Sequence, residues 1–223
     1  MLPRIIAESI PDKALKSWVK EKAAVYYPGN RYSHVKQVKN IAFQLFGEVQ
    51  RLGLAQFEKN AVNILYTAAL LHDAGYTAGI GDLAHEVFSM QAILLADIPM
   101  LSEKAKNKAA LVAYYHRSDM PDDSNERFTA LSYKDQTEVR MLAAILKIAD
   151  VLDRDHRQQV KRVVLVPMHD SYTLRILINK KKKYDYKWSP FEGMTRFMER
   201  LEQKSLLFKR ELGQALRISF EQE

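Results

Sequence analysis

A change in hydrophobic period divides this chain of 223 residues into two parts. Up to about residue 160, apolar residues recur at the spacing of three or four residues that is typical of amphipathic helices. Beyond that point they alternate every second residue, as in half-buried strands. The fold class that we predict is therefore mainly α. A helical bundle is expected over residues 1–160, with a small C-terminal α+β subdomain of strand, helix and strand over residues 161–223 packed on it.

Start and stop signals divide the first part into helices. Pro11 fits the first turn of the first helix, Ser33 is expected to be the N-cap of the second, and the third should run from about Phe57 to residue 71. Ser102 is expected to cap the fifth helix. In the second part we expect strands at 163–166 and 172–178, a helix at about 191–212 and a short strand near 216–220.

The composition excludes several classes of protein. The chain has no cysteine, so disulfides, thiolate metal sites and a cysteine nucleophile are all excluded. No apolar run approaches the roughly 18–20 residues that span a bilayer. The first residues also lack the basic and apolar regions of a signal peptide. We therefore expect a cytoplasmic protein with no membrane partner.

The net charge of +7 favours an anionic partner, either nucleic acid or a small phosphorylated molecule. Part of this excess is local, because Lys180 to Lys183 form an uninterrupted basic run. Like-charge runs are usually solvated loops, and we interpret this one in that way. Aromatic residues follow it closely, so nucleic-acid binding stays open as a weaker alternative.

Polar residues fall on the apolar faces of five predicted helices. On the third helix the apolar face continues into His72, with Asp73 beside it, and on the fifth it leads to His116. The sixth carries Asp150 on its apolar stripe. Two further histidines lie in the first turns of the second and fourth helices. The complete set is His34, His72, Asp73, His85, His116 and Asp150.

Each of these residues has a structural interpretation when it is taken alone. A buried histidine is commonly hydrogen-bonded to a carbonyl, and Asp150 could pair with Lys147 or Arg154 one turn away. Burying an unpaired carboxylate costs several kcal/mol, however, so each position would need its own partner. One bound divalent cation would account for all of them together, because neutral imidazole and ionised carboxylate are its usual ligands. We therefore predict a metal site.

The order of these residues resembles the signature of the HD-domain metal-dependent phosphohydrolase superfamily. His34 comes first, then the adjacent pair His72 and Asp73, then Asp150 at the end of an apolar helix. The chain is more closely similar to the C-terminal HD region of the exopolyphosphatase / guanosine pentaphosphate phosphohydrolase family. The segments 115–117 and 145–158 and the strand–helix–strand ending carry this similarity. The actin-like domains of long family members have no counterpart here, so the resemblance does not imply exopolyphosphatase activity.

The resemblance implies an HD-domain helical bundle with a metal centre. His34, His72, Asp73 and Asp150 would bind one ion, and His85 and His116 match the extra histidines of two-metal members, with Asp73 bridging. The predicted catalytic residues are Asp73, Lys147 and Arg117. The residues expected to bind substrate are Arg31, Lys147, Arg154 and Arg117. A site so rich in imidazole favours Mn, Fe, Zn or Co over Mg.

The function that we predict is hydrolysis of a phosphoester or phosphoanhydride bond, in a nucleotide, by a metal-activated water. The alternative is a non-catalytic HD module that binds a nucleotide or polyphosphate in a regulatory role. The expected partner in both cases is a small phosphorylated molecule, and a homo-oligomer is compatible with either. A nucleic-acid binder that uses the lysine run would explain the charge but not the inward-facing histidines.

Overall fold

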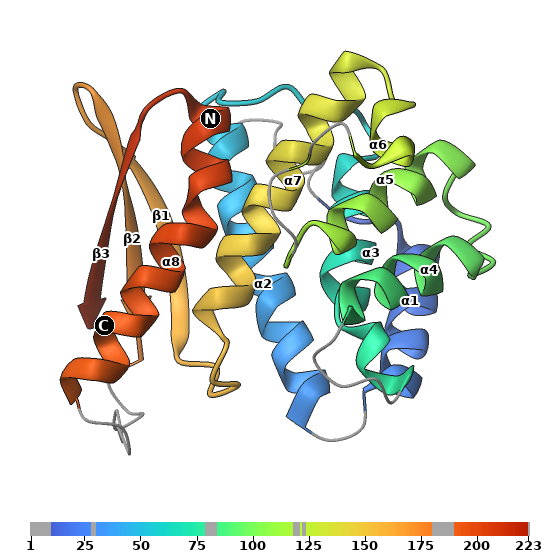
Figure 1. Cartoon of the computed structure of the whole chain (residues 1–223), viewed down its shortest axis with the longest axis horizontal. Helices are drawn as coiled ribbons and strands as arrows, with labels where there is room; N and C mark the ends of the chain where they lie inside the picture. The colour runs from blue at the N-terminus through green and yellow to red at the C-terminus, as the bar shows by residue number, and fades with distance from the viewer. Residues whose placement is uncertain are drawn as a thin grey trace.

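The computed structural model describes residues 10–27, 30–78, 84–117, 121, 124–179 and 190–222. A helical bundle comes first and a three-stranded sheet with one helix follows it (Figure 1). In chain order the elements are α1 (Lys13–Tyr26), α2 (Asn30–Arg51), α3 (Ala61–Leu71), the 3-10 helix η2 (Ala74–Ala78), α4 (His85–Leu95), α5 (Glu103–Tyr114), α6 (Glu126–Thr129), α7 (Tyr133–Leu152), β1 (Val160–Pro167), β2 (Ser171–Ile178), α8 (Pro190–Leu212) and β3 (Ala215–Gln222). The predicted fold class, mainly α with a small C-terminal α+β part, is confirmed.

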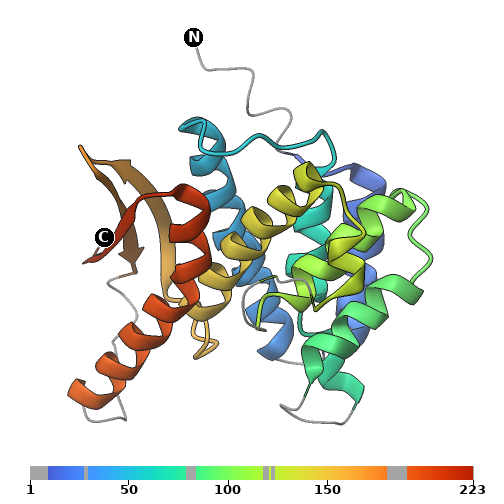
Figure 2. The ribbon, with the colours of Figure 1, turned by 45° about the horizontal axis from the view of Figure 1, so that its top comes forward.

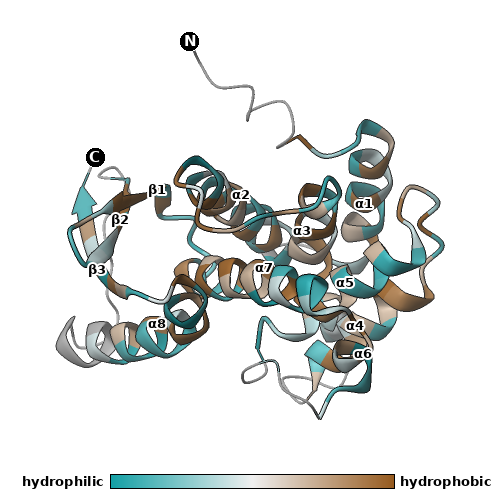
Figure 3. Ribbon diagram, turned by 90° about the horizontal axis from the view of Figure 1, so that it is seen from above, coloured by the Kyte–Doolittle hydropathy of each residue, from teal (hydrophilic) through white to brown (hydrophobic). Residues whose placement is uncertain are grey.

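Helix α7 is the central element of the bundle. Viewed from above, it lies in the middle with α2, α3, α5 and α8 around it (Figure 3). Most of its residues are buried, among them Leu142, Leu146 and Ala149, because neighbours pack on several sides. Figure 2 shows the sheet and α4 at opposite ends of the molecule. A buried α7 therefore reaches from one end of the core to the other and carries Asp150 near its end.

Side-chain caps set several of the helix starts. Ser102 accepts a hydrogen bond from the amide of Ala105 at 3.2 Å, as predicted, and Ser132 caps α7 in the same way. The prediction for Pro11 was wrong by two positions, because Asp12 accepts from the amide of Leu15 and is itself the cap of α1.

Two other predicted starts were also wrong. Helix α2 begins at Asn30, so Ser33 lies inside its first turn and is exposed instead of capping it. Phe57 belongs to the connection before α3, which begins at Ala61. The short α6 was not predicted. Its N-cap Asn125 accepts from the amides of Arg127 and Phe128.

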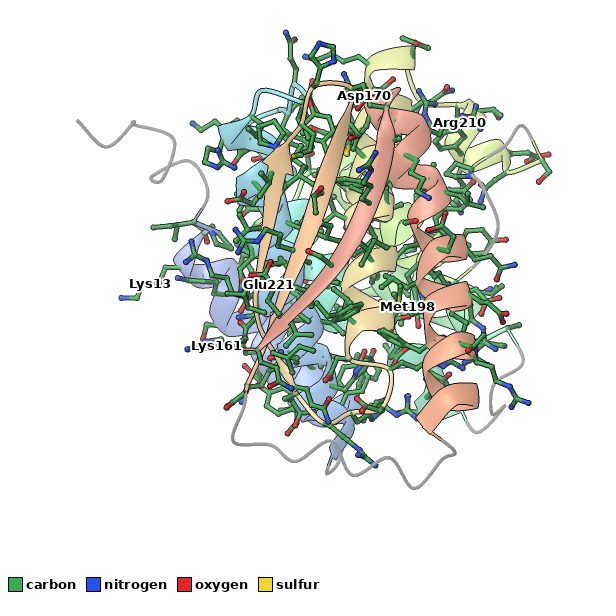
Figure 4. The ribbon with its side chains drawn as sticks, turned by 90° about the vertical axis from the view of Figure 1, so that its left-hand side faces the viewer. Lys13, Lys161, Asp170, Met198, Arg210 and Glu221 are labelled. Atoms are coloured by element: carbon green, nitrogen blue, oxygen red, sulfur yellow. The ribbon has the colours of Figure 1, made fainter. Side chains whose placement is uncertain are left out.

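The sheet has the order β1–β2–β3. A tight turn joins β1 to β2 as an antiparallel hairpin, with Leu165 opposite Leu174. Strand β3 runs parallel to β2, with Leu174 opposite Ile218, and α8 makes the connection that a parallel pair requires. Figure 4 looks onto the sheet and shows α8, with Met198 and Arg210, running beside β3. The strands predicted from the two-residue period are confirmed, each somewhat longer than expected.

Side chains of α2 satisfy the outer edge of β1. Gln44 Oε1 accepts a hydrogen bond from the amide of Val163 at 2.9 Å, and Glu48 Oε2 accepts from the amide of Leu165 at 3.0 Å. Arg51 donates to the carbonyl of Leu165 at 3.0 Å. Gln37 and Gln44 donate to the carbonyls of Val160 and Lys161. These contacts, which we call the edge ladder, replace a neighbouring strand and fasten the sheet to the bundle.

In the described part of the chain, no helix has the length and apolarity needed to cross a membrane. The basic run from Lys180 to Lys183 lies outside the described residues. Helix α8 packs along α7, so the C-terminal part contacts the bundle directly. The division of the chain at residue 160 into two domains stays a prediction.

Candidate metal centre

The structure brings the six polar residues of the predicted site together, and we call this group the His/Asp centre. Five different helices or helix ends contribute to it. His34 comes from α2, His72 and Asp73 from the end of α3, and His85 from the first turn of α4. His116 follows α5, and Asp150 lies on α7. All except Asp150 are buried, and its side chain keeps 18% of its exposure. The centre therefore has one side near solvent.

Four residues form a first group with the spacing of metal ligands. His34 Nε2 lies 3.4 Å from Asp150 Oδ1 and 3.8 Å from Asp73 Oδ2. His72 Nε2 lies 3.7 Å from Asp150 Oδ1 and 3.5 Å from Asp73 Oδ1. Ligand atoms about 2.0–2.2 Å from a common ion are separated by roughly 3 to 3.6 Å. His34, His72 and Asp73 lie close enough to one another to hold one ion, and Asp150 faces the same two imidazole nitrogens.

A second group shares Asp73 with the first. Asp73 Oδ1 lies 3.4 Å from His85 Nε2 and 3.7 Å from His116 Nε2. The two imidazole Nε2 atoms are 3.2 Å apart. His34, His72 and Asp73 on one side, and Asp73, His85 and His116 on the other, could each hold a metal ion. Asp73 is thus the only member of both groups among the described residues.

Helix ends explain why two of the imidazoles point inward. His72 is the C-cap of α3, and its Nδ1 donates to the carbonyl of Ala69 at 3.0 Å. His116 follows the C-cap of α5, and its Nδ1 donates to the carbonyl of Ala113 at 2.5 Å. Because the last carbonyls of a helix lack intrahelical partners, each ring satisfies one of them. A carbonyl accounts for one ring nitrogen only, and Nε2 remains directed at the carboxylates.

The donor set fits a metal ion at the first group. His72 Nε2 is buried and has no hydrogen-bond partner among the described residues, although it faces two carboxylates. In the neutral ring, with Nδ1–H donated to a carbonyl, this Nε2 carries a lone pair. A lone pair buried beside anions is unfavourable by itself and becomes favourable when a cation lies between them.

Asp153 holds His34 in the same orientation and was not predicted. His34 Nδ1 donates to Oδ2 and to the main-chain carbonyl of Asp153, each at 3.1 Å. Asp153 is 1% exposed and also accepts from the amide of Gln158 at 2.7 Å. A carboxylate behind a metal-binding imidazole fixes its tautomer and raises its basicity. The only sequence signal was the spacing of three residues from Asp150, which places both aspartates at the end of α7.

His85 differs from the other three imidazoles. Arg117 donates to its Nδ1 at 2.9 Å, and a guanidinium can only donate. The proton of neutral His85 must then be on Nε2, where it faces Asp73 and His116. In this arrangement the second group fits an ion only if Arg117 leaves Nδ1. The first group has no such conflict.

The charges of the centre favour added positive charge. Burial raises the pKa of Asp73, but the charge of His72 and the hydrogen bond from His85 outweigh it and hold that pKa well below the usual range. The pKa of Asp150 is shifted in the same direction, against its own burial, by the hydrogen bond from His34 and by the positive charge of the neighbouring imidazoles. Burial lowers the pKa of His34, yet Asp150 and Asp153 raise it to about 10. Both carboxylates thus stay ionised.

Two of the predicted substrate-binding arginines reach the centre. Arg31 donates to Asp73 Oδ2 at 3.1 Å and stacks on the ring of Tyr76, 3.8 Å from its centroid. Arg117 donates to the hydroxyl of Tyr76 at 3.4 Å as well as to His85. Of the other two predicted cations, Lys147 is buried on α7 one turn before Asp150, and Arg154 is exposed just after that helix.

Two further residues next to the centre were not among the predicted site residues. His156 stacks on His34 with ring centroids 4.1 Å apart. Lys204 reaches in from α8 and donates to the carbonyl of His116 at 2.8 Å. Burial lowers the pKa of Lys204, Asp150 opposes this shift, and Arg117 adds to it. No sequence signal marked Lys204, because it is one of many basic residues on an amphipathic helix.

A third acidic group, away from the centre, is already neutralised by lysine. Glu58, Asp135 and Glu138 lie close enough to hold a cation. The buried ammonium of Lys108 lies between them, 2.9 Å from Asp135 and 2.5 Å from Glu138. Glu58 accepts from the same ammonium at 3.3 Å. The group is therefore an internal ion-pair network and not a candidate metal site.

A family model provides independent evidence on what this arrangement belongs to. The model described as Ppx/GppA phosphatase, domain III, matches residues 31–207. The match includes every residue of the His/Asp centre, the two arginines that contact it and Lys204. No curated protein matches the chain. Because the matched residues make up most of its length, the chain belongs to the Ppx/GppA phosphatase domain III family.

Proposed function

We propose that this protein is a metal-dependent phosphohydrolase that cleaves a phosphoester or phosphoanhydride bond of a nucleotide. The observation that carries the proposal is the convergence of His34 and His72 Nε2 on the carboxylates of Asp73 and Asp150, at separations of 3.4–3.8 Å. Membership of a phosphatase family supports the reaction class. The partial exposure of Asp150 supports access for a substrate from that side.

Four residues would hold the ion: His34, His72, Asp73 and Asp150. A bound divalent ion supplies a water whose pKa is lowered from 15.7 to about 7, so that hydroxide is present at neutral pH. By accepting from Nδ1, Asp153 would fix the tautomer of neutral His34 that leaves the Nε2 lone pair available to such an ion. The imidazole content favours Mn, Fe, Zn or Co over Mg.

Cations beside the His/Asp centre would bind the phosphate. Arg31 and Arg117 already lie beside the centre, and both can donate hydrogen bonds to phosphoryl oxygens. We assign Lys147 and Arg154 the same role, as further cations at the Asp150 end of α7. Charge that develops on the equatorial oxygens in the transition state would be stabilised by these groups.

The observations support recognition of phosphate more directly than recognition of a base. Tyr76 stacks on His85, with centroids 4.1 Å apart, while Arg31 lies 3.8 Å from the centroid of the same ring. Two groups so close to one ring occupy its opposite faces, so neither face is open to a base. Tyr115 is buried against Phe128. A nucleotide would therefore be held mainly by its phosphates.

A second candidate function is a non-catalytic module that binds a nucleotide or polyphosphate in a regulatory role. The contact between Arg117 and His85 Nδ1 favours it over a two-metal enzyme, because His85 could bind a second ion through Nε2 only with its proton on Nδ1, where Arg117 donates. The two candidates differ in one measurable property. The enzyme requires a metal and turns over, whereas the module binds phosphates without turnover.

The test combines metal content with hydrolysis. Protein purified without chelator should contain one or two transition-metal ions per chain by elemental analysis, and it should hydrolyse members of a nucleotide panel when Mn²⁺ is supplied. Asp73→Asn should reduce hydrolysis to background and lower the metal content. Glu221→Gln, a change on β3 that among the described contacts loses the ion pair with Arg175, should change neither. Metal-free wild-type protein that binds nucleotides without hydrolysis would favour the regulatory module instead.

A further inference from the structure

Lys204 connects the C-terminal helix to the His/Asp centre. It lies on the buried face of α8, between Leu201 and Phe208, both 0% exposed. Its ammonium donates to the main-chain carbonyl of His116 at 2.8 Å and to that of Arg117 at 3.4 Å. A cation on an apolar helix face needs a reason to be there, and these two carbonyls provide one.

The segment that Lys204 holds reaches both parts of the centre. The His116 ring faces Asp73, and the Arg117 guanidinium bonds to His85 and Tyr76. This segment follows the last turn of α5, where main-chain carbonyls lack helical partners. The Ala113 carbonyl orients the His116 ring, while Lys204 restrains the main chain that carries it. Ring and backbone are thus fixed by different elements.

We propose that Lys204 is a positioning residue of the centre, which fixes the main chain of His116 and Arg117 and so makes α8 part of the functional site. The proposal rests on the function proposed above for its catalytic consequences. Its structural part, restraint of the segment after α5, stands without a bound metal. The negative charges of Asp150 and Glu86 act favourably on the ammonium, and the positive charges of Arg117 and Arg154 act against it.

The first test measures amide hydrogen exchange in metal-free protein. Lys204→Met should accelerate amide exchange at residues 115–117 roughly tenfold, because a hydrogen bond to a charged group stabilises the closed segment by at least that factor. The exchange rates of α2 should not change. Lys209→Met is the matched control on the same helix, since Lys209 pairs only with the exposed Glu202 among the contacts described. If Lys204→Met folds poorly, Lys204→Gln repeats the test with a smaller loss of polarity. Exchange that is unchanged, or accelerated equally throughout the protein, would overturn the proposal.

The second test measures Co²⁺ binding by visible absorption. Lys204→Met should weaken the Co²⁺ affinity by about 10–100-fold and alter the d–d bands, the range found when groups behind metal ligands are removed. Lys204→Arg, which keeps the charge and the donors, should restore much of both, and Lys209→Met should match wild type. An unchanged Co²⁺ spectrum together with lost hydrolysis would contradict a positioning role. A wild-type protein that binds no Co²⁺ would count against the proposed function, while the exchange experiment still decides the role of Lys204.

Discussion

The two ring nitrogens of the buried imidazoles make different contacts. In His34, His72 and His116, Nδ1 donates to oxygen and Nε2 faces the carboxylates. His85 departs from this pattern because a guanidinium lies at its Nδ1. The sequence predicted which histidines face inward, since apolar periodicity places them. It did not indicate which nitrogen is free, because that depends on partners far away in the chain.

Asp153→Asn tests the importance of the tautomer of His34. An amide can turn its NH₂ toward Nδ1, which would move the imidazole proton to Nε2 and remove the lone pair needed for a ligand. We expect metal affinity to fall by about 10–100-fold with little change in secondary structure. Isothermal titration with Mn²⁺ or Co²⁺ measures this. Asp155→Asn is the control, because Asp155 is exposed and bonds only to Arg157 among the contacts described. Equal affinities for both variants would contradict the role of Asp153.

Lys108→Met should destabilise the protein strongly. Lys108 is 2% exposed, and its removal leaves the buried Glu138 without its cation and Asp135 with the exposed Lys104 alone among the described cations. Breaking a buried ion pair by removing one partner costs about 3–5 kcal/mol. Urea denaturation should show a loss of that size in the free energy of unfolding. Lys134→Met, which removes an exposed cation paired with Glu58, should change it by less than about 1 kcal/mol.

The same network predicts how stability depends on acid. Burial raises the pKa of Asp135, but hydrogen bonds from Lys104, Ser132 and Lys108 hold it well below the ordinary value of 3.8. Because the folded state holds this proton less tightly than the unfolded state, the contribution of Asp135 is complete above about pH 4–5 and is lost as the pH falls further. Urea denaturation at several pH values from 6 to 3 measures this. The free energy of unfolding should fall less steeply with decreasing pH for Asp135→Asn than for wild type. Identical slopes would contradict this assignment.

Between elements, the approach of η2 to α4 depends on one glycine. The Gly75 amide donates to the Ser89 hydroxyl at 2.9 Å, and a Cβ at this position would lie 2.1 Å from the carbonyl oxygen of His85. Gly75→Ala must therefore push the first turn of α4 away from the centre. We expect a loss of about 1–3 kcal/mol in the free energy of unfolding, typical of overpacking, together with weaker metal binding. Chemical denaturation measures the first quantity and metal titration the second.

Gly47→Ala provides the matched control for this substitution. Gly47 lies inside α2, where a Cβ would meet nothing within 4 Å. Alanine is preferred to glycine within a helix by about 0.5–1 kcal/mol, so this variant should be more stable than wild type. Opposite signs for the two substitutions would attribute the Gly75 effect to the contact with α4. Two equal losses would contradict that interpretation.

Element boundaries were predictable where a cap is local. Ser102 bonds to the amide of Ala105, three residues away, so this cap can be recognised from a short segment. Asn125 forms an equally local cap, but the four-residue helix α6 that it starts was not predicted. Ser33 carries the same type of side chain but lies inside α2, which begins three residues earlier at Asn30. Local propensity offers several possible starts there, and tertiary packing selects among them.

At the scale of the whole molecule, the sequence predicted the residues of the His/Asp centre better than the residues that hold them in place. The six ligand candidates could be found because each interrupts an apolar stripe that periodicity defines. Asp153, Lys204 and the edge ladder act through main-chain carbonyls or amides that are more than 80 positions away, and no local pattern reports such contacts. Lys108 was missed for the same reason, since its carboxylate partners lie on other elements.

Helix α2 serves two neighbours at once. His34, near its beginning, faces the centre, and Gln44, Glu48 and Arg51 further along bind the rim of the sheet. A tilt at one end of a continuous helix is transmitted to its other end. A rotation of the sheet relative to the bundle would therefore tilt α2 and displace the His34 imidazole. A molecule that bound the strands and tilted α2 would also move His34 within the His/Asp centre.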